Sequence, residues 1–317
     1  MDVSKTYFVT GGAGNIACQL TFPLAGAGDR VILFDIAEMP ASAVADGCQY
    51  VQGDITDREQ IKKAIGHYAP TTVLHLASLL SGSTEEDREL GWRVNVDGAF
   101  GLLQESLRQG VRTVVFPSSL AAYGAPLPVP VPEDHPQWPR SLYGVTKVAI
   151  ERLGNYYHQQ HGLDFRCLRL PIVISAQARP GAVSGYVSRA YIAACQQDPF
   201  VFQVREQSSP ALIYIKDVVR AILGLATAEE SRLSRRVYNV QALSPTAGQV
   251  CAAIQARRPE SELRFQTDPA VTALIDSWPV RFDDQSSRRD WNWQPEYGLE
   301  TMSDDFCQQL ARPGPAG

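Results

Sequence analysis

Tyr143 and Lys147 are the two residues of this chain whose types and spacing best suit proton-transfer chemistry. Residues four apart lie on one face of a helix, about one turn from each other. A phenol has a pKa of about 10 and is a poor base near neutral pH, but a neighbouring ammonium group stabilises the phenolate. Ser118 and Ser119 follow a predicted strand and offer hydroxyls that can hold a substrate oxygen. These residues favour removal of a proton from a substrate hydroxyl; the alternative is an exposed helix face beside a serine-rich turn.

A glycine-rich segment, Thr10-Gly11-Gly12-Ala13-Gly14, lies between a predicted strand and a predicted helix. In that context Gly11 allows a tight turn, and Gly14 lets the backbone approach a pyrophosphate held at the helix N-terminus. Ala17 stands where a third glycine is usual, and its single methyl group should be tolerated. We predict a dinucleotide site here, the alternative being a connection that binds no ligand.

Asp35 follows the second predicted strand, 21 residues after Gly14. A carboxylate at this place can accept both ribose hydroxyls of NAD and would repel the 2′-phosphate of NADP, so NAD is favoured. A solvated turn aspartate is the alternative. Asp54 and Ile55, which follow the third predicted strand, are placed to flank an adenine ring, although Asp54 fits a helix cap equally well.

Predicted strands and helices alternate along the first half of the chain, which favours right-handed βαβ units and a parallel sheet. We therefore predict an α/β fold with a Rossmann-type doubly wound sheet. A proline-rich segment, 126–139, should be a loop. The predicted strands are 6–9, 31–34, 50–52, 72–76, 113–116 and 165–170, and the predicted helices are 15–27, 57–67, 88–109 and 142–161.

The regular alternation weakens after Pro171. We expect residues 1–171 to form the NAD-binding domain and residues 172–310 a smaller substrate-binding region, of which 237–240 returns to the main sheet. Residues 311–317 should be a flexible tail.

Composition excludes several classes of protein. The chain has 317 residues, 44% of them hydrophobic and 20% charged, with a net charge of −5 and no basic block, so we expect no nucleic-acid partner. No apolar run is long enough to span a membrane, and the first one leads into the glycine turn, so we expect neither membrane partner nor secretory leader. The six cysteines are scattered without metal-binding spacing, which is typical of buried, reduced thiols in a cytoplasmic protein and predicts no metal.

Several of these motifs together resemble the extended short-chain dehydrogenase/reductase family over nearly the whole chain. The resemblance rests on Thr10-Gly-Gly-Ala-Gly14, His75-Leu-Ala-Ser78, Asn95, Ser119 and Tyr143-x-x-x-Lys147. It implies that Tyr143 is the general base, that Lys147 lowers its pKa and binds the nicotinamide ribose, and that Ser119 polarises the reacting oxygen, with Ser118 ranked second. Asn95 would hold the helix behind the active site, or is an ordinary polar helix residue.

The cofactor contacts expected on this basis are Gly11, Gly14, Asn15, Ile16, Asp35, Asp54, Ile55, Leu76, Ala77, Ser78, Asn95, Tyr143, Lys147, Pro171 and Val173.

Further segments resemble one branch of that family, the short-chain type of L-threonine 3-dehydrogenase. They are Phe116-Pro-Ser-Ser119, Leu153-Gly-Asn-Tyr-Tyr157, Asp276-Ser-Trp-Pro279 and Asp290-Trp-Asn-Trp293. The branch implies oxidation of the β-hydroxyl of threonine by NAD to 2-amino-3-ketobutyrate. It also implies a homodimer built on the helices near 92–108 and 142–160.

One loop departs from the pattern of the branch. After Pro180-Gly181 the branch carries Thr-Thr-Asp-Tyr, where this chain has Val183-Ser184-Gly185-Tyr186, so a hydroxyl is kept and a carboxylate is lost. Another β-hydroxy acid is therefore an alternative substrate. Ser81 is interpreted equally well as a turn residue or as a substrate contact. Trp278 is interpreted equally well as a core residue or as a substrate contact. The expected substrate contacts are Ser81, Ser119, Tyr143, Ser184 and Trp278.

Two further functions are alternatives on the same fold. The first is a nucleotide-sugar epimerase or dehydratase. The dehydratases usually have an acidic pair after the strand-end serine, where this chain has Leu120-Ala121, and the C-terminal region is short for a bulky nucleotide sugar. A cofactor-sensing protein without catalysis typically lacks the tyrosine or the lysine, and both are present here. We therefore expect an NAD-dependent dehydrogenase of a small hydroxy amino acid.

Overall fold

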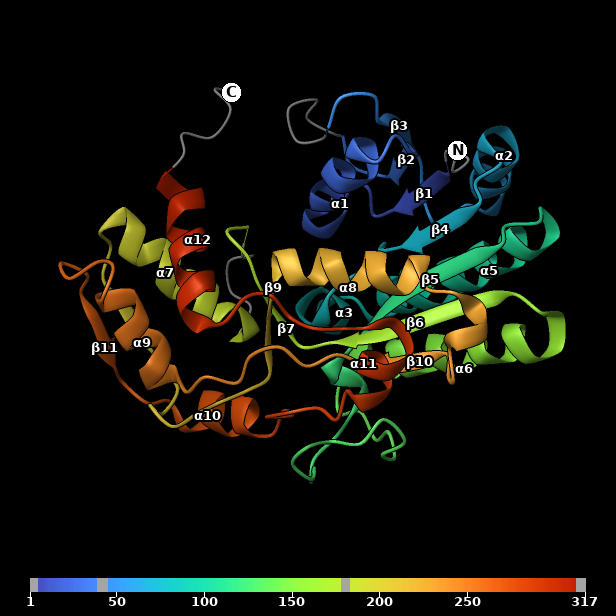
Figure 1. Ribbon diagram of the computed structural model, residues 1–317. Helices are drawn as coiled ribbons and strands as arrows, with labels where there is room; N and C mark the ends of the chain where they lie inside the picture. The colour runs from blue at the N-terminus through green and yellow to red at the C-terminus, as the bar shows by residue number, and fades with distance from the viewer. Residues whose placement is uncertain (1–4, 39–44, 178–182, 312–317) are drawn as a thin grey trace.

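A computed structural model describes residues 5–38, 45–177 and 183–311, and within them a seven-stranded parallel sheet forms the centre of the molecule (Figure 1). The strand order is β3-β2-β1-β4-β5-β6-β10. The order reverses between β1 and β4, which is where ligands bind in doubly wound sheets. The predicted Rossmann-type fold is confirmed. The strands are β1 (Thr6–Thr10), β2 (Arg30–Asp35), β3 (Gln49–Gln52), β4 (Thr72–His75), β5 (Thr113–Ser119), β6 (Asp164–Leu170) and β10 (Val237–Asn239).

Strand β5 is longer than the sequence predicted. The expected strand stopped before Pro117, because proline cannot donate a hydrogen bond to a neighbouring strand. In the structure Pro117, Ser118 and Ser119 stay in register with residues 168–170 of β6. The two serines therefore lie on the last residues of a central strand, at the carboxyl edge of the sheet.

Helices cover both faces of the sheet. Apolar side chains of α1 (Asn15–Gly26) and α8 (Ile215–Thr227) pack on one face. Those of α2 (Arg58–Tyr68), α5 (Ala99–Arg108) and α6 (Leu142–His161) pack on the other. Figure 1 shows α8 crossing one side of the sheet, with α5 and α6 on the opposite side.

Helix α6 fits closely against the sheet at Gly154. A Cβ atom there would lie 2.2 Å from the ring of Phe165, a fully buried residue of β6. Glycine is required at this position because a core ring cannot move aside in a tightly packed interior.

The predicted long helix 88–109 is interrupted. It consists of α4 (Arg88–Trp92), a π-helical turn η2 (Arg93–Gly98) and α5, and Asn95 lies in the π-helical turn. A π turn adds one residue to a helical turn and is frequent at functional sites. The short helix α3 (Ser81–Glu86) precedes α4 and was not expected, because its sequence is rich in serine and glycine.

The smaller C-terminal region lies beside the main sheet, at the left of Figure 1. It has its own apolar core, in which the rings of Tyr191 and Phe306 lie 5.0 Å apart. Its strands form two pairs, β7 (Ile172–Ile174) with β9 (Leu212–Tyr214) and β8 (Phe200–Phe202) with β11 (Leu263–Phe265). Its helices are α7 (Tyr186–Gln196), α9 (Ala247–Gln255), α10 (Pro269–Asp276) and α12 (Leu299–Ala311), and the 3-10 turn η4 (Val183–Gly185) directly precedes α7. Helix α11 (Gln285–Trp291) instead packs on the main sheet, in the same apolar core as α1 and α8. Two further 3-10 turns are η3 (Leu120–Ala122) and η5 (Glu230–Arg232).

The sequence analysis also made predictions about a returning strand, a proline-rich loop, a C-terminal tail and membrane-spanning segments. The segment predicted to return to the main sheet is β10, which pairs with β6. Residues 126–139 are all described and contain no helix and no strand beyond an isolated bridge at Val131. Most of the predicted tail, 312–317, and the Pro180-Gly181 pair lie outside the described residues. Within the described ranges, no helix is both long and apolar enough to cross a membrane.

Candidate active site

The glycine loop between β1 and α1 is closed by backbone contacts that only glycine allows. Gly11 has φ +69°, and a Cβ atom on it would lie 2.7 Å from the backbone nitrogen of Ala77. Gly14 is the N-cap of α1 and has no side chain to accept hydrogen bonds from the first turn. The N-terminal amides of the helix therefore keep their capacity to bind an anion. This geometry fits the pyrophosphate of a dinucleotide.

Asp35 lies at the end of β2, directly beside this loop. Its carboxylate accepts hydrogen bonds from the backbone amides of Ala13 and Ala37, both at 3.0 Å. Each carboxylate oxygen has a further lone pair, so ribose hydroxyls can still bind. Gly11, Gly14 and Asp35 thus together fit a dinucleotide.

Asp54 and Ile55 follow β3, on the same side of the sheet as Asp35. Asp54 accepts a hydrogen bond from Thr56 N at 2.8 Å, and Asp57 is the residue that caps α2. The helix-cap alternative for Asp54 is therefore wrong. Ile55 is buried and packs against Gly98. Their predicted adenine contacts stay a prediction.

Three successive turns of α6 hold the end of β5. Tyr143 lies close enough to the hydroxyl of Ser119 for the two side chains to interact. One turn later Lys147 Nζ donates to Pro117 O at 3.0 Å, and after another turn Glu151 accepts from the hydroxyl of Ser118. The structure therefore brings Ser119, and not Ser118, to the tyrosine, in agreement with the predicted ranking.

Glu151 is buried and forms an ion pair with Arg169, a buried residue of β6, with a nitrogen–oxygen distance of 2.7 Å. Arg169 also donates to Glu133 O at 2.8 Å. The sequence analysis missed both residues. The only sequence signal for a role of Glu151 was its position eight residues after Tyr143, on the same helix face. Many helix residues have such a spacing, so it does not single out Glu151.

Burial shifts the pKa values of both Tyr143 and Lys147. Loss of hydration lowers the pKa of Lys147 to about 8, while the charge of Glu151 acts against this decrease. Burial raises the pKa of Tyr143 to about 12, although its interaction with Ser119 opposes the increase. The sequence predicted that Lys147 lowers the pKa of Tyr143. In the chain alone desolvation prevails, because Lys147 Nζ lies 5.3 Å from the centre of the tyrosine ring and bonds to Pro117 O instead.

His75, at the end of β4, supports the site from behind. It is buried, its Nδ1 lies 2.7 Å from Thr10 Oγ1, and its ring stacks on Phe116. Burial and the nearby Lys147 lower the pKa of His75 to about 3. The imidazole is therefore neutral at physiological pH, and we assign it no acid or base role.

Asn95 connects β4 to α6. Its side-chain oxygen accepts from Leu79 N at 2.8 Å, and its amide donates to Leu79 O at 3.0 Å. The same amide donates to Thr146 Oγ1 at 3.3 Å. Asn95 is thus placed to hold α6, as expected, while its predicted cofactor contact stays a prediction.

The other predicted site residues come from several elements. Asn15 at the start of α1 donates to Ser175 Oγ at 2.6 Å, which joins the glycine loop to the segment after β7. Ser81 is exposed at the start of α3, and Trp278 packs partly on the core of the smaller region. Half-buried positions are found for Ile16, Leu76, Ala77, Ser78, Val173 and Ser184, whereas Pro171 is buried.

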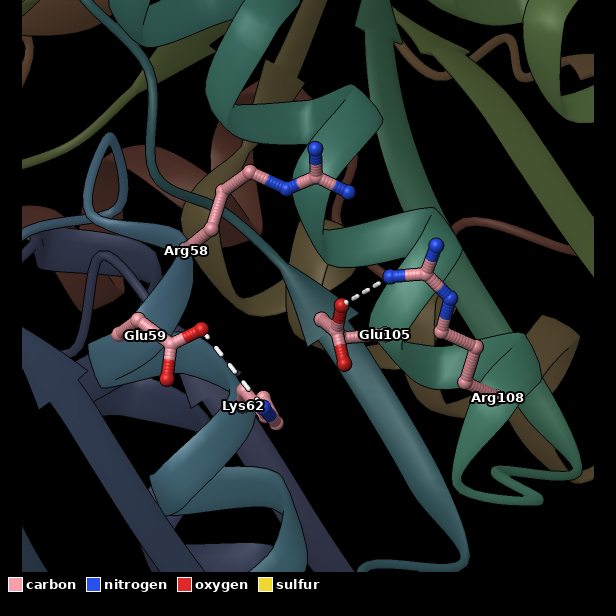
Figure 2. Close-up of a pocket in the computed structure, with 5 residues that line it drawn as sticks. All are labelled: Arg58, Glu59, Lys62, Glu105 and Arg108. Carbon is pink, nitrogen blue, oxygen red and sulfur yellow. Dashed lines mark hydrogen bonds and ion pairs between the residues drawn. The ribbon is translucent and has the colours of Figure 1, made fainter.

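Two hollows lie outside the Tyr143–Lys147 site. One, of about 460 Å³, is formed by the charged side chains of α2 and α5 that Figure 2 shows. In it Glu105 pairs with Arg108 at 2.7 Å and Glu59 pairs with Lys62 at 3.6 Å, so opposite charges largely cancel. The other, of about 210 Å³, adjoins Ser184 and is lined by Val183, Tyr186, Arg189, Phe200, Val201, Gln203, Val204 and Val271.

Comparison with known proteins gives a consistent result. Residues 7–240 match the sequence model of the NAD dependent epimerase/dehydratase family. The mitochondrial L-threonine 3-dehydrogenase of Bos taurus is 34% identical over 298 residues, which cover 93% of this chain and 79% of the relative.

Two solved structures agree with this. The L-threonine dehydrogenase of Clostridium difficile is 29% identical with a TM-score of 0.91, over 97% of this chain and 98% of the other. A monomeric L-threonine 3-dehydrogenase from a metagenome database is 28% identical with a TM-score of 0.88, over 96% and 98% of the two chains. With the glycine loop, the strand-end serine and the tyrosine–lysine pair in place, this chain belongs to the NAD dependent epimerase/dehydratase family, the extended short-chain dehydrogenases/reductases.

Proposed function

We propose that this protein is an NAD-dependent dehydrogenase that oxidises the β-hydroxyl of a small hydroxy amino acid, L-threonine being the favoured substrate and 2-amino-3-ketobutyrate the product. The observation that carries the proposal is the placement of Tyr143 next to Ser119 and beside the buried Lys147, at the carboxyl end of β5. Relatives named as threonine dehydrogenases over nearly the whole chain support the choice of substrate.

In this proposal Ser119 and Tyr143 both hydrogen-bond the substrate hydroxyl, and Tyr143 takes its proton. NAD in its oxidised form, when bound, would accept the hydride from the substrate carbon that carries this hydroxyl. Gly11, Gly14 and Asp35 hold the dinucleotide. Lys147 keeps its proton near neutral pH, since its pKa is about 8, and its positive charge favours the phenolate during proton transfer.

Recognition of the rest of the substrate would fall to Ser81, Ser184 and Trp278. Ser184 lies in η4 beside the hollow that Tyr186 lines. Gly185 stands where relatives of the threonine branch carry an aspartate, so this chain provides no carboxylate there to pair with a substrate ammonium group. In this proposal the ammonium group of the substrate therefore gains less binding energy near Gly185 than it would beside a carboxylate.

A substrate panel tests the proposal. The purified protein is incubated with NAD and L-threonine, 3-hydroxybutyrate, UDP-glucose or UDP-galactose, and both NADH formation and sugar epimerisation are followed. We expect NADH with L-threonine, at a kcat/KM above that for 3-hydroxybutyrate. Epimerisation of the nucleotide sugars without net NADH would replace this proposal with the epimerase alternative. A preference for 3-hydroxybutyrate would keep the hydride chemistry and reject the amino acid.

We propose that NAD is preferred to NADP because of Asp35. Replacing Asp35 by Gly together with Ile36 by Arg removes the repelling carboxylate and adds a cation next to it; Ile36 is 65% exposed, so the new side chain is accommodated. We expect the ratio of Kd for NADP to Kd for NAD to fall at least about tenfold, since each 1.4 kcal/mol changes Kd tenfold. Titration of both dinucleotides measures it. An unchanged ratio would remove Asp35 as the specificity determinant.

We also propose a cytoplasmic homodimer with a small-molecule substrate and neither nucleic-acid nor membrane partners. Exposed apolar side chains on α4, α5 and α6, namely Trp92, Phe100, Val145 and Tyr156, support the predicted interface. Light scattering after gel filtration should give a mass near twice 34.8 kDa. Phe100→Glu should yield monomers, whereas Phe22→Glu on α1 should not. A monomeric wild type, as described for the metagenome relative, would overturn the proposal.

A further inference from the structure

Two cysteines that are far apart in the sequence meet between α7 and α12. Cys195 Sγ lies 3.9 Å from Cys307 Sγ although 112 residues separate them, and both side chains are half-buried. The sequence analysis expected scattered, buried thiols. Three of the six are buried, but Cys48, Cys195 and Cys307 are partly accessible. Nothing in the proposed dehydrogenase chemistry uses the pair.

Two arginines, Arg257 and Arg258, lie near these two thiols. The side chain of Arg258 lies close enough to Cys195 to interact with it, and Arg257 forms ion pairs with Glu300 at 2.9 Å and Asp304 at 2.7 Å on α12. A neighbouring guanidinium favours the thiolate, which is the reactive form of cysteine. Burial, followed by the nearby charge of Cys195, raises the pKa of Cys307 to about 11. Of the two thiols, Cys195 is the one that interacts with Arg258.

We propose that Cys195 and Cys307 form an oxidisable dithiol, which a hydroperoxide converts into a disulfide that links α7 to α12. The Cys195 thiolate attacks one peroxide oxygen, the O–O bond breaks, and an alcohol or water leaves, which gives a sulfenic acid on Cys195. The Cys307 thiolate then attacks that sulfur, the S–O bond breaks and water leaves. The two thiols lose two electrons, and the peroxide gains them.

The geometry suits this reaction. A disulfide requires the sulfurs to close from 3.9 Å to about 2 Å, a movement within the range of small side-chain rotations. The two helices already pack together through the rings of Tyr191 and Phe306. Cys18, Cys167 and Cys251 are buried, so a hydroperoxide reaches them poorly.

The bond would also change the stability of the smaller region. It closes a loop of more than 100 residues, and the loss of freedom in the unfolded chain stabilises the folded one. Helix α12 is held to the start of α8 by the ion pair of Asp305 with Lys216, at 2.6 Å. Oxidation would therefore fix α7 to a helix that is already anchored. This consequence does not depend on which substrate the enzyme uses.

The experiment counts thiols in the full-length protein. The reduced protein is freed of reductant, treated with about one equivalent of hydrogen peroxide, denatured and titrated with a chromogenic disulfide. We expect the six thiols to become four and dithiothreitol to restore them. Peptide mapping should find one crosslink, between the peptides of Cys195 and Cys307. The Tm of the oxidised protein should be higher by about 4–8 °C.

Single variants provide the controls. Cys48→Ser removes a half-buried thiol outside the pair. After peroxide treatment this variant should still lose two thiols, and its Tm should still rise. Cys195→Ser and Cys307→Ser should form no intramolecular crosslink and show no gain. Retention of all six thiols in the wild type would overturn the proposal, as would a crosslink between other cysteines or between two chains. If one serine variant fails to fold, crosslink mapping of the wild type against Cys48→Ser still decides the matter.

Discussion

The docking of α6 on the end of β5 is the interaction on which the rest of the site depends. Each of three successive helix turns holds one of three consecutive strand residues, through Tyr143, Lys147 and Glu151. Close packing at Gly154 brings the helix near enough to the sheet for these contacts. Since Lys147 and Glu151 are both charged and buried, the arrangement requires charge compensation, to which the ion pair of Glu151 with Arg169 contributes.

Burial also determines what the chain can and cannot do alone. It keeps His75 neutral, lowers the pKa of Lys147 and raises the pKa of Tyr143, each time by penalising the charged form. In the chain alone the phenol of Tyr143 is therefore protonated near neutral pH. The same dry surroundings strengthen every electrostatic interaction within the site.

The sequence predicted those features that depend on local spacing. The glycine loop, the carboxylate after β2 and the tyrosine–lysine pair are short motifs beside recognisable strands and helices, and the structure places them at one edge of the sheet. Features that depend on packing were missed. The π-helical turn around Asn95 looked like ordinary helix, and β5 was ended too early at Pro117.

Long-range pairs were missed for a related reason. Neither the ion pair of Glu151 with Arg169 nor the approach of Cys195 to Cys307 has a local sequence signal, because tertiary packing alone brings these residues together. The fold class and the placement of the tyrosine–lysine pair were thus accessible from sequence, whereas the network that supports them required the structure.

The most direct test of the account compares Tyr143→Phe with Tyr156→Phe, a matched change at a tyrosine of α6 that is 51% exposed. For each variant, Kd for NAD and kcat with the best substrate of the panel are measured. The account predicts that Tyr143→Phe lowers kcat at least about 100-fold with Kd for NAD nearly unchanged, while Tyr156→Phe changes neither. Wild-type kcat in Tyr143→Phe would contradict the assignment of this phenol as the base.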